Sequence, residues 1–385
     1  MLARMFGCAR VVFNDALRCR DEACRAGERI SPTEVQRRVV ALAKTTDVRK
    51  WLGEVASVVL VQSVRDADRA FRNWFDSMAK RRRGHPVAHP RFKSRKDNRQ
   101  PARFTRNGFT LRPNGRLYLA KIGDVRVRWS RELPSKPSSV TVIREPDGHF
   151  CASFVVEVAP TPLLPIDREC GLDLGIARLV TVATSDGQRR DIPNPRHLAG
   201  KMRKLARLER EKARRVKGGK NRAKTRRKVA VQHAEVARAR RDYHHKQALM
   251  LVRENQAVYV EDLNVAGMVK NRRLARAICD AGWAQFVRLL EEKAKRHGRV
   301  VRKVSRWLPR SKTCSACGHV MEAMPLRMRL WTCPGCDVAH DRDHNAAKNV
   351  LAAGQAERLN ACGAGVSPSL GEAVGDEAGT TPGAA

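Results

Sequence analysis

The pattern of apolar and polar residues predicts a helical N-terminal part followed by a β-rich part. In residues 1–80, apolar side chains recur at the three- and four-residue spacing of one helix face. The clearest such face consists of Leu60, Val64, Ala67, Phe71, Trp74 and Met78. Residues 107–160 instead alternate with a period of two, and the dipeptide Asp147-Gly148 indicates a hairpin turn. We therefore expect helices followed by a small antiparallel sheet or barrel.

The pattern changes again after residue 164, where strands and helices are mixed. Residues 170–192 predict two strands joined by a tight turn at Gly175, followed by a hairpin. An apolar strand at 256–265 ends in acidic residues, and 280–298 has the apolar face of a helix. In that helix we expect Asp280 to be the N-cap and Gly298 to be the stop.

The charge of the chain indicates a polyanionic partner. Lys and Arg number 77 against 39 acids, which gives a formal net charge of +38. This imbalance favours a nucleic acid as the partner. The alternatives are a protein that binds a membrane surface and one whose own surface is simply highly charged. Residues 201–247 hold nineteen Lys and Arg against four acids, a charge of +15, and the sequence VKGGKN at 216–221 divides them into a helical hairpin. We expect this hairpin to contact RNA or DNA, the alternative being a solvated charged face.

A second basic segment spans residues 80–106, with eleven Lys and Arg and one acid. Its aromatic residues Phe92 and Phe104 suit stacking on bases, although a basic linker with two anchoring aromatics would have the same composition. No apolar run reaches the roughly 18 residues that a membrane span needs. We therefore expect a cytosolic or nuclear protein, in which cysteines do not form a disulfide framework.

Four of the eleven cysteines form two C-x2-C pairs. Cys314 and Cys317 are separated by fifteen residues from Cys333 and Cys336, and this spacing is typical of four-cysteine zinc sites. The segment between the pairs is too short for a core of its own, so that the metal would supply the folding energy. Because four thiolates complete the tetrahedral shell, we expect a structural zinc.

Three acids lie at unusual positions. Asp173 lies inside an apolar strand, Glu261 ends another, and Asp343 lies just before an expected helix. Each has an ordinary explanation alone: a turn cap, a strand-end salt bridge or an N-cap. A carboxylate within a buried strand costs several kcal/mol unless it is paired or binds a metal. Together the three could hold two divalent ions about 3.5–4 Å apart for phosphodiester hydrolysis, and oxygen ligands suit Mg2+ or Mn2+.

The segments GLDLGI, VYVEDLNVAGM, SKTCSACGHV and HDRDHNAAKNV occur in this order along the chain. In these motifs and their order, the chain closely resembles the TnpB family of transposon-encoded RNA-guided DNA endonucleases, which are related to type V CRISPR nucleases. The resemblance implies an α+β multidomain protein with an RNase H-like (RuvC) nuclease domain interrupted by a zinc ribbon, a wedge β-barrel and a helical recognition domain.

By motif, the resemblance assigns Asp173, Glu261 and Asp343 to the three catalytic carboxylates that bind Mg2+ or Mn2+, and the four cysteines to zinc. It leaves Asp341 beside the metal site or sharing in metal binding. It implies a guide RNA from the transposon end and double- and single-stranded target DNA as partners, in a bacterial cytoplasm at the nucleoid. We favour a monomer. Within the basic hairpin we expect the densest charges to contact nucleic acid, namely Arg222, Lys224, Arg226 and Arg227.

The resemblance also implies domain boundaries. We expect a helical recognition domain (1–90), a basic linker and wedge barrel (91–163), a first nuclease part (164–310), a zinc module (311–339), a second nuclease part (340–362) and a disordered tail (363–385). Members of the family usually begin with a strand before the first helix, so either the start codon is assigned too late or the first wedge strand is missing here.

Two other functions have similar sequence requirements. A guided DNA-binding protein without cleavage would share the architecture, but such relatives lose one or more of the carboxylates, and all three are present here. A zinc-containing structural RNA-binding protein would share the composition, but it would not need acids within buried strands.

Overall fold

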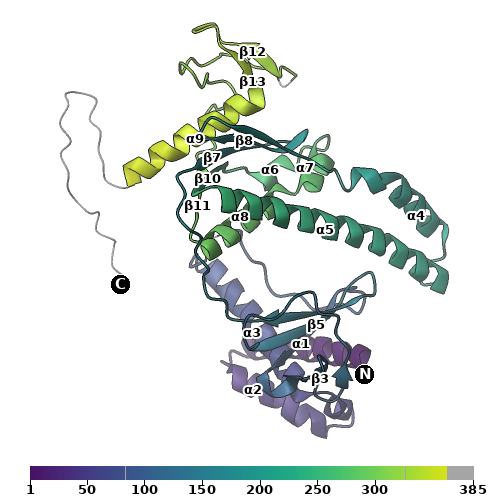
Figure 1. Cartoon of the computed structure of the whole chain (residues 1–385). Coiled ribbons are helices and arrows are strands. Elements are labelled where there is room, and N and C mark those ends of the chain that lie inside the picture. The colour runs from purple at the N-terminus through teal and green to yellow at the C-terminus, as the bar shows by residue number, and fades with distance from the viewer. Residues whose placement is uncertain (83, 326, 362–385) are drawn as a thin grey trace. The chain divides into compact units, whose positions relative to one another are not determined.

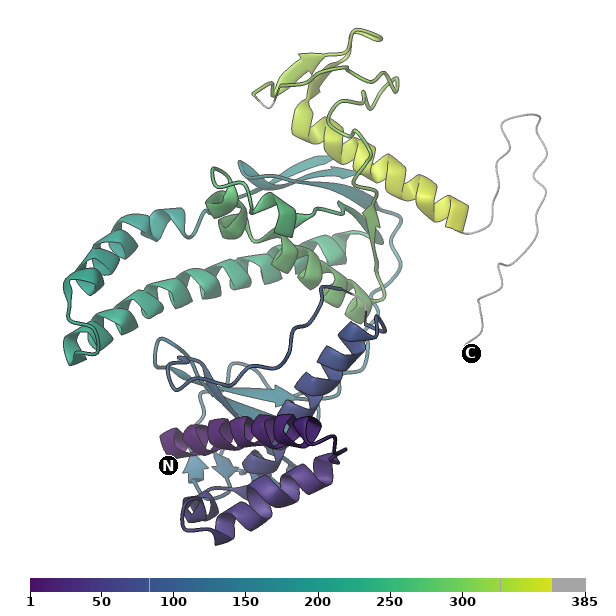
Figure 2. The same ribbon diagram turned by 180° about the vertical axis from the view of Figure 1, so that it is seen from behind.

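The computed structural model describes residues 1–82, 84–325 and 327–361 (Figures 1 and 2). The chain divides into two compact units, Met1–Val158 and a second one that begins at Ala159. No helix among the described residues is long and apolar enough to span a bilayer. The tail that we expect to be disordered, 363–385, lies outside the described residues.

Two long helices dominate the first unit. Helix α1 (Leu2–Arg25) packs along α3 (Ser57–Met78). Short helical segments connect them: α2 (Pro32–Gln36), the π-helical η1 (Arg37–Leu42) and the 3-10 turns η2 (Ala43–Thr45) and η3 (Lys50–Glu54).

The strands of the first unit form two three-stranded antiparallel sheets. One has the order β1-β5-β6 and the other β2-β3-β4. The strands are β1 (Gln100–Thr105), β2 (Phe109–Leu111), β3 (Leu117–Leu119), β4 (Gly123–Val125), β5 (Ser139–Arg144) and β6 (Phe150–Val155), and the turn η4 (Arg106–Gly108) links the first two. The antiparallel pairing and the hairpin at Asp147-Gly148 confirm the alternating pattern, while closure into a barrel stays a prediction.

The helices and sheets of this unit share one apolar core. The predicted face of α3 is buried from Leu60 to Phe71, whereas its last member, Met78, is 58 % exposed. Phe104 is fully buried in this core, so that the expectation that it stacks on bases was wrong. Phe104 belongs to β1, and its position there faces the helices. Phe92 is exposed and stays available for such a role.

The second unit is built on a five-stranded sheet with the order β11-β10-β7-β8-β9. The strands β7, β10 and β11 are parallel to one another, and β8 and β9 are antiparallel additions. Their bounds are β7 (Glu169–Leu174), β8 (Arg178–Thr184), β9 (Arg189–Pro193), β10 (Ala257–Glu261) and β11 (Val300–Val304). The strands β7, β8, β9 and β10 were expected from their apolar runs and turns.

Helices cover both faces of this sheet (Figures 1 and 2). On one face Cys170, Leu172 and Leu174 of β7 pack with α5 (Lys220–Glu254) and α8 (Trp283–His297). The alternate residues of the strands face α9 (Arg342–Ala361). Because successive strand residues point to opposite faces, Asp173 lies on the α9 side.

The expected basic hairpin is present as α4 (Met202–Arg214), preceded by the turn η5 (Ala199–Lys201), and the 35-residue α5. The helices α6 (Val265–Met268) and α7 (Ala275–Ala281) precede α8. Asp280 does not cap α8, because it belongs to α7 and accepts hydrogen bonds from the backbone N–H groups of Leu198 and Ala199. It therefore holds the start of the hairpin. Gly298, with φ of +64°, ends α8 as expected.

Candidate active site and zinc centre

The parallel pairing of β7 and β10 brings the first two acids together. Leu172 lies opposite Val260, so the next residues along the two strands, Asp173 and Glu261, are neighbours. Glu261 is 6 % exposed, and Asp173 is half-buried. Burial raises the pKa of Asp173 well above its usual range, and the hydrogen-bonded Glu261 carboxyl raises that pKa further.

Helix α9 brings the third acid, Asp343, to the same edge of the sheet. On the α9 side of β7, Gly171 lies directly against the backbone carbonyl of Ala347. Two strand residues span about 6.6 Å and one helical turn about 5.4 Å, so Asp343, four residues before Ala347, comes level with Asp173. Consistent with this, the negative charge of Asp343 also raises the pKa of Asp173.

Asp341, rather than Asp343, caps α9. Its Oδ1 accepts hydrogen bonds from the backbone N–H groups of Asp343 (3.1 Å) and His344 (3.0 Å). Its Oδ2 lies 3.0 Å from the Arg189 guanidinium. Burial alone would raise the pKa of Asp341, but the His344 N–H and Arg189 lower it overall. The ordinary explanation of Asp343 as an N-cap therefore fails, and its side chain is directed to other partners.

Arginines from three different segments pair with these acids. Arg310, between β11 and the cysteines, lies 2.8 Å from Glu261 Oε2 with its side chain 13 % exposed. Arg178 of β8 and Arg329, just before β12, lie 3.4 and 3.1 Å from the two carboxylate oxygens of Asp343. None of the three arginines was predicted from the sequence, because isolated Arg residues carry no signal in so basic a chain.

The donor set of this site suits a hard divalent cation. The three acids supply only oxygen ligands. Burial raises the pKa of Asp173 most, and Glu261 and Asp343 raise it further although Arg310 lowers it. The carboxylates are nevertheless not drawn into one tight cluster: among the described residues, only the four cysteines form such a group of three or more potential ligands. A cation bound between these acids would have to replace the contact of Arg310 with Glu261.

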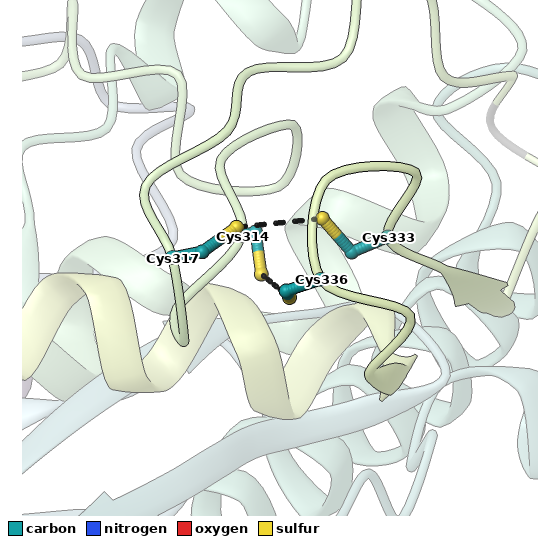
Figure 3. Close-up of side chains that lie close together, drawn as sticks. All are labelled: Cys314, Cys317, Cys333 and Cys336. Carbon is teal, nitrogen blue, oxygen red and sulfur yellow. Dashed lines mark hydrogen bonds between the residues drawn. The ribbon is translucent and has the colours of Figure 1, made fainter.

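The two predicted C-x2-C pairs face each other from two loops, as Figure 3 shows. Their four sulfur atoms lie within 4.8 Å of one another. The Cys314–Cys336 and Cys317–Cys333 sulfur separations are 3.7 and 3.6 Å. Tetrahedral Zn–S bonds of about 2.3 Å require sulfur separations of about 3.8 Å, so the arrangement fits a zinc ion. The short strand β12 (Leu330–Thr332) leads into the second C-x2-C pair, and β13 (Ala339–Asp341) leads out of it.

His340 supports the cysteine cluster from outside. Its Nε2 lies 3.0 Å from the Cys314 sulfur, and its ring packs against Trp331. Burial by itself raises the pKa of Cys314, but backbone N–H groups and His340 lower it to about 6. Cys314 is therefore prepared to act as a thiolate ligand near neutral pH.

Two asparagines on α9 connect the first cysteine loop to the acids. Asn345, 1 % exposed, accepts from the Ser315 N–H at 2.8 Å and donates to the Thr313 carbonyl at 2.7 Å. Asn349, one turn later, donates to the carbonyls of Arg310 and Thr313, both at 2.7 Å. The backbone of Arg310 is thus fixed to α9 while its side chain reaches Glu261. The four-residue spacing of the two asparagines in HNAAKN was the signal that could have shown this.

In the basic hairpin the four singled-out residues are not equivalent. Arg222 donates to the carbonyls of Lys212 and Arg215, at 2.9 and 2.8 Å, and so closes the hairpin. Lys224, Arg226 and Arg227 are exposed. These three side chains are the ones whose position suits contact with nucleic acid.

Comparison with known proteins agrees with this architecture. Residues 153–272 match the family model OrfB_IS605, described as "Probable transposase", 283–350 match "Cas12f1-like, TNB domain", and 1–29 match a helix-turn-helix domain of OrfB_IS605. The chain is 42 % identical over 370 residues to a "Putative RNA-guided DNA endonuclease" of Streptomyces pristinaespiralis, with 95 % of this chain and 88 % of that protein covered. The chain belongs to the TnpB family.

A second relative in the TnpB family is InsQ of Escherichia coli K12, a "Putative RNA-guided DNA endonuclease" that is 32 % identical over 94 % of this chain and 90 % of its own length. Among solved structures, the chain resembles Cas12f1 in its complex with sgRNA and target DNA. The TM-score is 0.55 at 15 % identity, with 91 % of this chain and 82 % of that chain covered. At this identity the likeness shows a shared fold.

We predict about one tightly bound zinc ion per chain. Cys314→Ser should lose that zinc and loosen residues 311–340, because the segment has too small a core to fold without the metal. Metal analysis and hydrogen exchange measure both effects. The matched control is Cys279→Ser, an exposed cysteine outside the cluster, which should retain full zinc content. Well-folded wild-type protein without zinc would contradict the site.

We also predict that Asp173 makes folding stability fall as pH rises. Its pKa is raised in the folded protein, so the folded state holds a proton that the unfolded state loses above about pH 4. In buffer without divalent cations, Asp173→Asn should therefore gain unfolding free energy over wild type as pH rises from 4 towards neutral. Denaturant unfolding across that range measures the gain.

The control for this titration is Asp186→Asn, because a hydrogen bond from Thr184 lowers the pKa of Asp186. That variant should show no gain at higher pH. A stability difference between Asp173→Asn and wild type that stays constant with pH would contradict the raised pKa.

Proposed function

We propose that the chain is an RNA-guided, divalent-metal-dependent DNA endonuclease in which Asp173, Glu261 and Asp343 are the catalytic carboxylates. The observation that carries the proposal is the register of β7, β10 and α9, which directs three acids to one edge of the sheet in a member of the TnpB family. The strand order, with a central β7 flanked by β10 and β8, supports an RNase H-like (RuvC) nuclease domain.

In this proposal the three carboxylates hold Mg2+ or Mn2+, and such ions supply an activated water and stabilise the leaving oxygen in phosphodiester hydrolysis. Asp173 would bind the metal in its ionised form, so metal binding opposes the raised pKa of this carboxyl. Arg310 must leave Glu261, because its guanidinium occupies a carboxylate oxygen that would bind the metal. Arg178 and Arg329, which flank Asp343, are placed to attract a phosphate to the site.

The four cysteines then hold a structural zinc that fixes the chain between Arg310 and Asp343. Asn345 and Asn349 bind the backbone of this fixed segment to α9. The guide RNA, derived from the transposon end, and the target DNA are the partners, and the exposed charges of the basic hairpin bind phosphates. Such a protein acts in the bacterial cytoplasm at the nucleoid, and we favour a monomer.

For the catalytic acids, we predict that Asp173→Ala, Glu261→Ala and Asp343→Ala each reduce Mg2+-dependent DNA cleavage by at least about a thousandfold, because the loss of a metal ligand removes several kcal/mol of transition-state stabilisation. Target binding should stay largely intact. Single-turnover cleavage and binding assays separate the two effects. Asp186→Ala, in the exposed β8–β9 turn, is the control and should cut normally. A Glu261 variant that cuts at the wild-type rate would overturn the assignment.

For the basic hairpin, we predict that changing Lys224, Arg226 and Arg227 together to Gln weakens RNA binding for every guide sequence alike, because phosphates carry no sequence information. The slope of log K against log salt should flatten by roughly 0.7–0.9 per lost contact. Arg222→Gln, tested separately, should instead loosen the hairpin, because it loses two carbonyl partners.

The control for the triple variant is Lys295→Gln with Arg296→Gln, two exposed charges in the last turn of α8. If that pair flattens the salt slope equally per charge, the effect is a general one of net charge. If the triple variant keeps both its affinity and its slope, the hairpin is a solvated face.

A further inference from the structure

The segment Ser305–Arg310 is fastened at two points to the strand end that carries Glu261. Arg306 pairs with Asp262, and Arg310 pairs with Glu261 at 2.8 Å. Glu261 and Asp262 are consecutive at the end of β10, so the two ion pairs hold both sides of a short loop beside the acids. The loop turns back on itself, with the Arg310 N–H donating to the Leu308 carbonyl at 2.8 Å.

Trp307 lies between these two anchoring arginines and is 87 % exposed. It is the most exposed of the six tryptophans of the chain: Trp283 and Trp331, for example, are buried. Its backbone N–H donates to the Ser305 hydroxyl at 3.3 Å, which restrains the main chain while the indole faces solvent. A large flat ring is thus exposed on a restrained loop beside Glu261, where a planar ligand can reach it.

Indole rings stack on the faces of unpaired bases regardless of base identity. The chemistry around Trp307 favours such a ligand, because Arg310, once a bound cation replaces its contact with Glu261, can attract a phosphate. A base within duplex DNA is covered on both faces by its neighbours, and only an unpaired or unstacked one can lie on the indole. The position of the loop at Glu261 favours the strand being cut over the guide RNA.

We propose that Trp307 is a positioning residue that stacks on an unpaired base of the DNA strand entering the nuclease site and so holds the nearby phosphate against the acids. This inference rests on the proposed function. It adds a residue outside the carboxylates that recognises an unpaired base. The loop transfers the position of the base to the site through Arg306, which pairs with Asp262 beside Glu261.

The test uses the full chain with its copurified RNA and target strands in which single nucleotides near the cut are replaced, one at a time, by abasic sites. In wild type, one abasic position should slow cleavage about five- to tenfold in kcat/KM, in the lower range of base stacking on an aromatic ring. Trp307→Ala should be slowed by a similar factor on the intact strand and should no longer respond to that abasic position. Trp307→Phe, which keeps a ring, should retain the response.

Zinc content and thermal unfolding check that the variants are folded, as the exposure of Trp307 leads us to expect. An abasic profile of Trp307→Ala identical to that of wild type would overturn the proposal. The proposal would also be overturned if Trp307→Ala weakened guide-RNA affinity or binding of a protein partner while its abasic profile stayed that of wild type. If Asp173→Ala still cuts, the proposed nuclease site itself is wrong, whereas a failed abasic response with intact acid dependence rejects only the stacking.

Discussion

The close approach of α9 to the sheet is the constraint on which the site depends. A Cβ atom at Gly171 would come within 2.2 Å of the Ala347 carbonyl oxygen, and one at Gly354 within 2.0 Å of the Tyr259 ring. Because both positions admit only hydrogen, the helix cannot slide along β7 and β10 without a steric clash. Near its other end, Gln355 and Arg358 bind the buried Glu169 at 2.9 and 2.5 Å. The start of α9, and with it Asp343, is therefore held at a defined height above Asp173.

The electrostatics of the second unit follow from this geometry. Acids that converge in a buried edge repel one another, and the chain offsets that repulsion locally with Arg178, Arg310 and Arg329, one from the sheet and two from the segments around the zinc loops. This explains why the cysteine cluster lies next to the acids at the start of α9. The segments around the cysteines carry Arg310 and Arg329 and the backbone groups that α9 binds through Asn345 and Asn349.

The elements of the fold could be predicted to a large extent from local patterns. Strands such as β7 and β10 are short apolar runs bounded by turn residues, and the VKGGKN break between α4 and α5 is a strong local signal. The cysteine cluster could also be predicted, because the spacing of ligands is a property of the sequence. Errors arose where tertiary contacts decide. Phe104 is buried by helices distant in sequence, and Asp280 caps a turn more than eighty residues away rather than its own helix.

The candidate site shows the same division. The three acids were noticeable because a carboxylate in an apolar strand is costly. Their arginine partners and the capping role of Asp341 depend on which side chains the fold brings near, and a chain with 77 Lys and Arg offers too many candidates for any one to stand out.

The length of α5 sets the physical reach of the nuclease unit. Its C-terminal turns are buried against the sheet through Ala248, Leu251 and Val252, whereas near its start Val229 packs against α4. Thirty-five residues at 1.5 Å each make a rod of about 52 Å, longer than one turn of a DNA duplex at about 34–36 Å. The turns before Arg240, which donates to the Cys279 carbonyl, form a basic arm of about 30 Å, slightly less than one such turn. Because this arm is rooted in the sheet, its exposed charges stay at a fixed distance from the acids.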